Sequence, residues 1–181
     1  FIFLGIQDIN ENTCVNIYKY FHHHPYFQNV MTKCKDVIIS NNWATEKEWD
    51  SLLIYKKNST ALLLNLVALS IYYALAKLMI YIGIKPKTVI GQELGEYVAA
   101  GIAGLFSLED MLHIIYSNLS QKDDFSNLLT KVTVKKAHSI EFLGSSANPY
   151  EASSFDYWNF HFNQLNTPEK IIRKYNCNLI I

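Results

Sequence analysis

The residues with the clearest chemical potential form a short glycine-flanked segment, GQELG, at residues 91–95 within the longer sequence TVIGQELGEYVAA. An apolar run precedes the segment and an alanine-rich run follows it, which predicts a strand, a sharp turn and a helix. In such a nucleophile elbow the glycines permit a strained turn, and the central side chain stands exposed at the start of the helix. The chemistry expected of an elbow is nucleophilic, with Glu93 at the position of the attacking side chain. The degenerate elbow comprises Gly91, Gln92, Glu93, Leu94 and Gly95.

The wider sequence around the elbow, VIGQELGEYVAAGIAGLFSLEDML, closely resembles the acyltransferase domains of modular polyketide synthases. In that family the segment reads V-I-G-H-S-L-G-E-Y-V-A-A and is followed by a helix start, G-x-F-S-L-E-D. The resemblance extends to FIFLGIQ, HPYFQNVMTKC, LSIYYALAKLMIYIGIKPKTVIG, KVTVKKAHSIEFLGSS and DYWNFHFNQLNTPEKII, so it covers nearly the whole chain. It implies a single acyltransferase-like domain over residues 1–181, with an α/β-hydrolase-like large subdomain around a mostly parallel sheet.

Several positions depart from the family pattern. The family's serine nucleophile falls on Glu93, and the histidine beside it falls on Gln92. The oxyanion-hole glutamine falls on Ile6, and the arginine that binds malonyl-type carboxylates falls near Asn118. The ferredoxin-like small subdomain, which carries the catalytic histidine, should lie within residues 119–130, where only about a dozen residues remain. The resemblance therefore implies a shortened domain that lacks its small subdomain.

A glutamate at the nucleophile position changes the chemistry of the elbow. Transfer of an acyl group from a thioester to a carboxylate gives an anhydride and runs uphill, and the helix dipole favours the anionic, less reactive form of Glu93. The sequence therefore predicts a catalytically inactive domain, without a cofactor or a metal. It would be a structural spacer, or a docking platform for a trans-acting acyltransferase or an acyl carrier protein beside neighbouring synthase domains.

Two alternatives stay open. The chain could be a residual acyl-thioester hydrolase or acyltransferase that uses Glu93 as a general base. It could also be a free-standing interaction protein built on the same scaffold.

Other candidate residues have mainly structural interpretations. The three adjacent histidines at residues 22–24 cannot face one metal from a helix, so a surface loop or helix start is favoured. His113 is interpreted as a helix histidine, His138 as part of a strand, and Glu96 as a structural cap or pair. The aromatic stretch at residues 155–162 is either a partner surface or a core contact, and its candidate surface residues are Phe155, Tyr157, Trp158 and Phe160.

Length and composition limit the classes of protein. The chain has 181 residues, of which 50% are hydrophobic, and a formal net charge of zero. This length suits one domain with a core, and the balanced charge argues against nucleic acid as the main partner. Cys14, Cys34 and Cys177 are odd in number and widely spaced, which favours reduced thiols in the cytoplasm. The chain begins with Phe1 and no signal-peptide pattern, which indicates a fragment of a longer protein.

The long apolar stretch at residues 61–84 has about the length of a membrane span. Asn65 and Lys77 interrupt it, and tyrosines add polar tips. We therefore expect a buried core helix that ends near Tyr81, and no membrane partner.

The remaining pattern alternates strands with helices, which predicts an α/β fold. Thr45 and Glu48 predict a capping box for a short helix, and Ser107 predicts a helix N-cap. The predicted strands are 1–4, 88–90, 132–134, 140–143 and 179–181; the predicted helices are 12–20, 25–39, 94–103, 107–119, 155–162 and 168–175, with a polar loop at 121–127.

Overall fold

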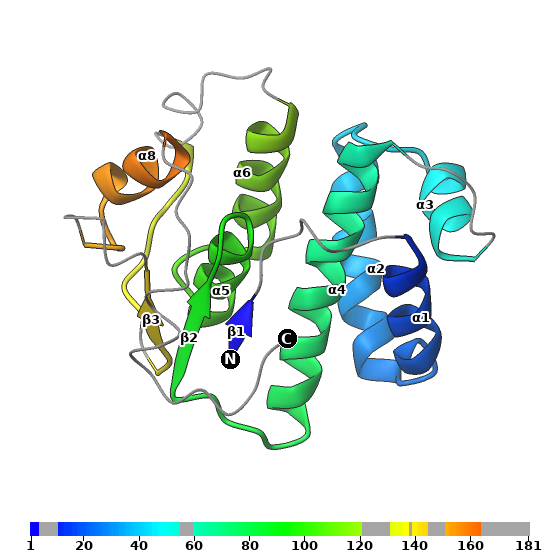
Figure 1. The fold of residues 1–181 in the computed structure, drawn as a ribbon, viewed down its shortest axis with the longest axis horizontal. Coiled ribbons are helices and arrows are strands. Elements are labelled where there is room, and N and C mark those ends of the chain that lie inside the picture. Colours follow the sequence, from blue (N-terminus) through cyan, green and yellow to red (C-terminus); the bar gives the residue numbers. More distant parts are fainter. Residues whose placement is uncertain (4–10, 55–59, 121–130, 138, 145–150, 164–181) are drawn as a thin grey trace. The chain divides into compact units, whose positions relative to one another are not determined.

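The computed structural model describes residues 1–3, 11–54, 60–120, 131–137, 139–144 and 151–163 (Figure 1). The chain forms two compact units, one of Phe1–Gly5 with Lys85–Ile181 and the other of Ile6–Ile84. The predicted polar loop, the last helix and the last strand lie outside the described residues, as do Ile6, His138 and Cys177.

The first unit is built on a three-stranded parallel sheet in the order β1-β2-β3 (Figure 1). Its strands are β1, Ile2–Phe3; β2, Thr88–Gly91; and β3, Glu141–Leu143. In the register Ile2 pairs with Ile90, and Val89 pairs with Phe142. Val89 and Ile90 are buried because β2 is the central strand, which explains its apolar sequence. The predicted α/β class with a parallel sheet is therefore confirmed over the described residues.

Three described helices belong to the first unit: α5, Gly95–Ala103; α6, Leu108–Ser120; and α8, Phe155–Asn163. Helix α5 is buried along its whole length and packs on the sheet, while α6 packs against α5. Gly104 ends α5 in the left-handed region with a φ of +83°. Ser107 caps α6 as predicted, because its Oγ accepts a hydrogen bond from the Asp110 amide at 3.0 Å.

The second unit is helical over its described residues and consists of α1, Glu11–Phe21; α2, Pro25–Ser40; α3, Glu46–Leu53; and α4, Ala61–Tyr81. The first three helices each pack against α4. The predicted capping box of α3 is confirmed: the Glu48 amide donates to Thr45 Oγ1 at 3.3 Å, and Glu48 Oε2 accepts from the Thr45 amide at 2.7 Å.

Helix α4 is long and apolar enough to cross a membrane by length and composition, with a mean hydropathy of 1.8 over its most apolar window. However, 67% of that window is buried inside the structure. Burial against α1, α2 and α3 removes the apolar side chains from water, so α4 fits the expected core helix, and its end at Tyr81 agrees with the prediction.

The strand predicted at residues 132–134 is wrong. Val132 and Val134 are half-buried and Thr133 is exposed, so the alternating pattern is present, but these residues join no strand ladder. The nearby backbone bond runs instead from the Lys135 amide to the Leu105 carbonyl at 2.9 Å. An alternating pattern of side chains is a property of a single segment, whereas a β-strand also needs a neighbouring strand at hydrogen-bond distance.

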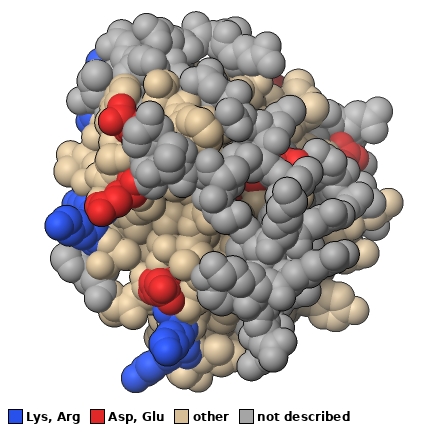
Figure 2. Space-filling view, turned by 60° about the vertical axis from the view of Figure 1, so that its left-hand side comes forward, with Lys and Arg blue, Asp and Glu red and all other residues tan. Residues whose placement is uncertain are grey.

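Charged side chains of both signs occur together on the face of the molecule shown in Figure 2. Among the described residues of that face, the lysines are interspersed with aspartates and glutamates rather than gathered by sign. The arrangement offers no large single-signed surface there.

Candidate functional site

Glu93 lies in the sharp turn between the central strand β2 and helix α5 (Figure 1), as the sequence predicts. Its φ of +48° lies in the left-handed region, which is uncommon for a residue other than glycine. Two backbone bonds close the turn: the Gly95 amide donates to the Gln92 carbonyl at 2.7 Å, and the Glu96 amide donates to the Glu93 carbonyl at 3.1 Å. The elbow stands at the carboxyl end of a parallel strand, where open α/β sheets bind ligands.

Gly91 is required by the close approach of two backbone segments. A Cβ added at this position would lie less than 3.0 Å from Glu96 Cα, from Glu96 N and from the Gly95 carbonyl oxygen. All three are main-chain atoms, which cannot rotate away as a side-chain end could. The glycine therefore lets β2 and the start of α5 meet closely enough to form the elbow.

The elbow side chains are partly accessible. Gln92, Glu93 and Leu94 are half-buried, whereas Gly91 and Gly95 are buried. The carboxylate of Glu93 belongs to a turn at a helix N-terminus, where backbone amides and the helix dipole favour an anion. The position therefore presents a carboxylate, in partial contact with solvent, where an elbow would present its nucleophile.

Next to the elbow, Glu96, Tyr157 and His161 form a buried polar cluster that the sequence did not predict. Glu96, on the first turn of α5, is 2% exposed, and its Oε1 accepts a hydrogen bond from the Tyr157 hydroxyl of α8. The other oxygen, Oε2, lies 3.2 Å from Nδ1 of His161, a residue that is 5% exposed. The second ring nitrogen, Nε2, lies 3.2 Å from the main-chain oxygen of Glu93.

The sequence carried one usable signal for this cluster. Tyr157 and His161 are four residues apart on α8, so they share one face of the helix. The interpretation of Glu96 as a structural pair is confirmed, but its partners lie too far along the chain for sequence spacing to identify.

The aromatic residues of α8 are mostly core rather than surface. Tyr157 is 3% exposed and Trp158 is fully buried, so the partner-surface interpretation is wrong for these two residues. Phe155, at 37% exposed, remains accessible, and Phe160 is half-buried. The correction follows from packing, because the Trp158 ring lies 4.7–5.7 Å by centroid from the rings of Phe106, Tyr97 and Phe142.

The histidines at residues 22–24 link α1 to α2 in the second unit, in agreement with the loop or helix-start interpretation. His24 caps α2, since its Nδ1 accepts from the Tyr26 amide at 3.2 Å, and His22 Nδ1 donates to the Lys19 carbonyl at 2.8 Å. His113 is half-buried on α6. Within the described ranges, no group of three histidine, cysteine, aspartate or glutamate residues is arranged to hold a metal ion.

The two described cysteines are free and buried in the second unit. Burial raises the pKa of the Cys14 thiol to about 11 and that of the Cys34 thiol to about 12, because desolvation disfavours the thiolate. Neither thiol therefore resembles a reactive cysteine, whose pKa would be lowered.

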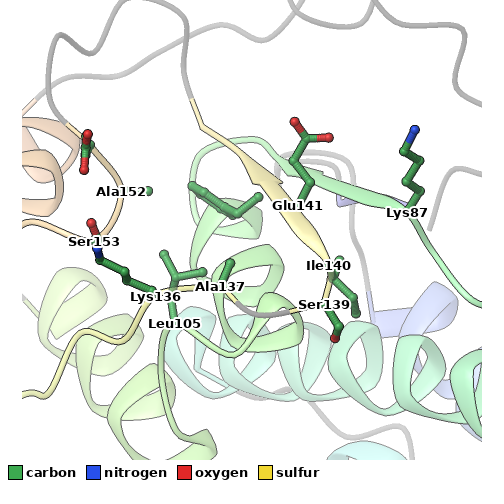
Figure 3. Close-up of a pocket in the computed structure, with 11 residues that line it drawn as sticks. Lys87, Leu105, Lys136, Ala137, Ser139, Ile140, Glu141, Ala152 and Ser153 are labelled. Carbon is green, nitrogen blue, oxygen red and sulfur yellow. The ribbon is translucent and has the colours of Figure 1, made fainter.

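A cavity of about 670 Å³ lies elsewhere in the first unit (Figure 3). Its lining includes Lys87, which precedes β2, Ser139, which precedes β3, and Ser153, which precedes α8. Lys87 and Ser139 are at the amino ends of β2 and β3, whereas the elbow is at the carboxyl end of β2. The cavity is consequently separate from the elbow and contains no residue of the buried polar cluster.

Comparisons with known proteins relate part of the chain to polyketide synthases. No protein-family model matches the chain. The chain is 28% identical over 134 residues to the non-reducing polyketide synthase ZEA1 of Gibberella zeae, an alignment that covers 69% of this chain and 6% of that protein. It is 37% identical over 81 residues to the non-reducing polyketide synthase ustP of Ustilaginoidea virens, covering 45% of this chain and 3% of that protein.

A third relative is the atrochrysone carboxylic acid synthase of Aspergillus fumigatus, which is 22% identical over 161 residues, or 84% of this chain and 9% of that protein. The chain thus spans less than a tenth of the length of each of these relatives. Over part of its length it has weak to moderate homology to fungal polyketide synthases.

Proposed function

We propose that the chain is an acyltransferase-like part of a polyketide synthase whose elbow no longer transfers acyl groups. The observation that carries this proposal is Glu93 in the turn at the end of the central parallel strand, with a φ of +48°. The homology to polyketide synthases and the family-like sequence around the elbow support the acyltransferase class. The proposed architecture is an α/β-hydrolase-like large subdomain without the ferredoxin-like small subdomain.

The chemistry of the elbow supports inactivity. A serine hydroxyl attacks a thioester to give an ester, whereas a carboxylate would give an anhydride, which returns its acyl group to the thiol. If water or another group attacked the thioester instead, the oxyanion of the tetrahedral intermediate would form beside the carboxylate of Glu93. Two negative charges in one partly desolvated turn repel each other, so the barrier rises just where an acyltransferase lowers it.

The proposed role is architectural. An inactive domain that keeps its buried core can hold neighbouring synthase domains apart, or can present a surface to a trans-acting acyltransferase or an acyl carrier protein in the cytoplasm. Among the candidate surface residues, Phe155 is the accessible aromatic side chain and is the first to truncate in binding experiments with such partners.

The test of inactivity is incubation of the 181-residue chain with malonyl or acetyl coenzyme A, followed by intact-mass measurement and a free-thiol assay. We expect no acyl adduct and no thioester hydrolysis above background. The matched control is the variant Gln92→His with Glu93→Ser, which restores the family's residues at these two positions and shows whether the turn can still present a nucleophile.

Two results would contradict the proposal. A stable acyl adduct on the unmodified chain would show that transfer chemistry persists. Thioester hydrolysis that disappears in Glu93→Gln would instead identify Glu93 as a general base, which is the residual-hydrolase alternative.

A further inference from the structure

Three polar side chains that are almost completely removed from water, Glu96 on α5 and Tyr157 and His161 on α8, connect α8 to the start of α5 and the elbow. Glu96, Tyr157 and His161 are 2%, 3% and 5% exposed. Buried polar groups are costly unless they are paired, so such a cluster must be compensated by its internal contacts. Two of the contacts lead from α8 to Glu96, and a third leads from His161 to the main chain of Glu93.

The contact with Glu93 determines which ring nitrogen of His161 carries a proton. A main-chain carbonyl oxygen can only accept a hydrogen bond, so Nε2 of His161 must be the donor across its 3.2 Å contact. The other nitrogen, Nδ1, faces Glu96 Oε2 at 3.2 Å, although the two are not aligned as a hydrogen bond. A further proton shared by this pair gives either an imidazolium beside a carboxylate or a neutral ring beside a carboxylic acid.

The remaining contacts hold the ring in place. The Tyr157 hydroxyl binds Glu96 Oε1, which leaves Oε2 toward His161. The rings of Tyr97 and Trp158 stand nearly perpendicular to the imidazole, with centroids 5.2 and 6.0 Å away. His161 therefore has a defined orientation, with one nitrogen directed at the elbow.

The elbow needs such support because Glu93 has the left-handed backbone conformation at φ +48°. A side chain with a Cβ is disfavoured in that region, and such residues persist where surrounding structure holds them. The bond from the Glu96 amide to the Glu93 carbonyl belongs to the turn itself. His161 reaches the same carbonyl oxygen from a helix 68 residues further along the chain.

We propose that His161 is a positioning residue of the elbow: held by Glu96 and Tyr157, it fixes the main chain of Glu93 in its left-handed conformation. Helix α8 is then a component of the elbow, and the direction of the side chain at position 93 depends on it. This inference concerns the main chain at position 93, so it holds or fails independently of whether the chain transfers acyl groups.

The first test is a double-mutant cycle between positions 161 and 93, measured by urea denaturation. Glycine adopts the left-handed conformation without support, so Glu93→Gly removes the need for the proposed restraint. We expect His161→Ala to lower the denaturation midpoint at least twice as much in the native background as in the Glu93→Gly background. Equal losses in the two backgrounds would make His161 a packing residue only and would overturn the proposal.

The control for this cycle is Ile114→Val, a substitution of a fully buried residue on α6. This control should lower the denaturation midpoint by the same amount in both backgrounds, because it changes packing and not the contact between His161 and the elbow. If His161→Ala does not fold, His161→Phe replaces it, since phenylalanine keeps an aromatic ring at this position but has no group that can donate to the Glu93 carbonyl. His161→Phe should likewise lower the denaturation midpoint at least twice as much in the native background as in the Glu93→Gly background, and equal decreases would again overturn the proposal.

A spectroscopic measurement gives a readout that packing alone would not move. Nitrogen-15 spectra of the histidines should show a protonated Nε2 for His161 in the native chain. In Glu96→Ala, this preference should weaken, and exchange of the Gly95 amide hydrogen in the elbow should accelerate at least tenfold. A native His161 with unprotonated Nε2 would lack the donor and would refute the proposal directly.

Discussion

Substitution of Gly91 by alanine tests the close approach that forms the elbow. The added methyl carbon would lie less than 3.0 Å from two main-chain atoms of Glu96 and from the carbonyl oxygen of Gly95. Overpacking a buried site costs about 1–3 kcal/mol, and we expect the upper end, about 3 kcal/mol, because the obstructing atoms are backbone. For a chain of this size that loss corresponds to a decrease in Tm of about 6–12 °C.

The assay is urea denaturation followed by circular dichroism, with the native chain and Gly91→Ala at the same pH. The matched control is Gly104→Ala, because Gly104 has a φ of +83° but no atom within 4 Å of an added Cβ. Its cost is conformational strain alone, about 1 kcal/mol. The reasoning would be refuted if Gly91→Ala lost no more stability than Gly104→Ala, since the strand and helix could then separate without penalty.

Three further predictions concern the second unit. Thr45→Ala should cost about 1 kcal/mol of unfolding free energy at neutral pH through loss of the helix cap, with Ser51→Ala, within the same helix, as the control that stays near the native value. The hydrogen bonds of Thr45 lower the pKa of Glu48, so the contribution of this carboxylate is complete above the ordinary value of 4.5 and is lost as the pH falls through the lowered value. The gap between the denaturation midpoints of the native chain and Glu48→Ala should therefore narrow on acidification, and a widening gap would contradict the capping geometry. For the thiols, the raised pKa values of Cys14 and Cys34, about 11 and 12 against an ordinary 9.0, predict alkylation by iodoacetamide at least about 100-fold slower in the folded chain than in urea, as measured by peptide mass spectrometry. Rapid labelling of either thiol in the folded chain would show that this thiol is accessible to the reagent and would contradict the prediction.

The sequence by itself determined the features whose causes act over a few residues. The capping box at Thr45 and Glu48 is a contact between positions three apart, and the end of α4 at Tyr81 follows from Gly83 and Pro86 a few residues later. The elbow was predictable for the same reason, because a glycine at position 91 and an apolar strand before it specify a turn that the chain makes locally.

Only the tertiary structure decided which side chains meet across the unit. The hydroxyl of Tyr157 reaches Glu96 over a separation of 61 residues, and His161 reaches Glu93 over 68. The composition of the aromatic stretch at residues 155–162 fits a surface and a core equally well. Contacts with distant segments decided between the two, and they bury Trp158 completely. Residues 132–134 have the alternating pattern of a strand, but they form no strand because they do not pair with a neighbouring strand. The spacing of residues along the chain predicts turns and helix faces, but contacts between distant segments depend on how the sheet and its helices pack.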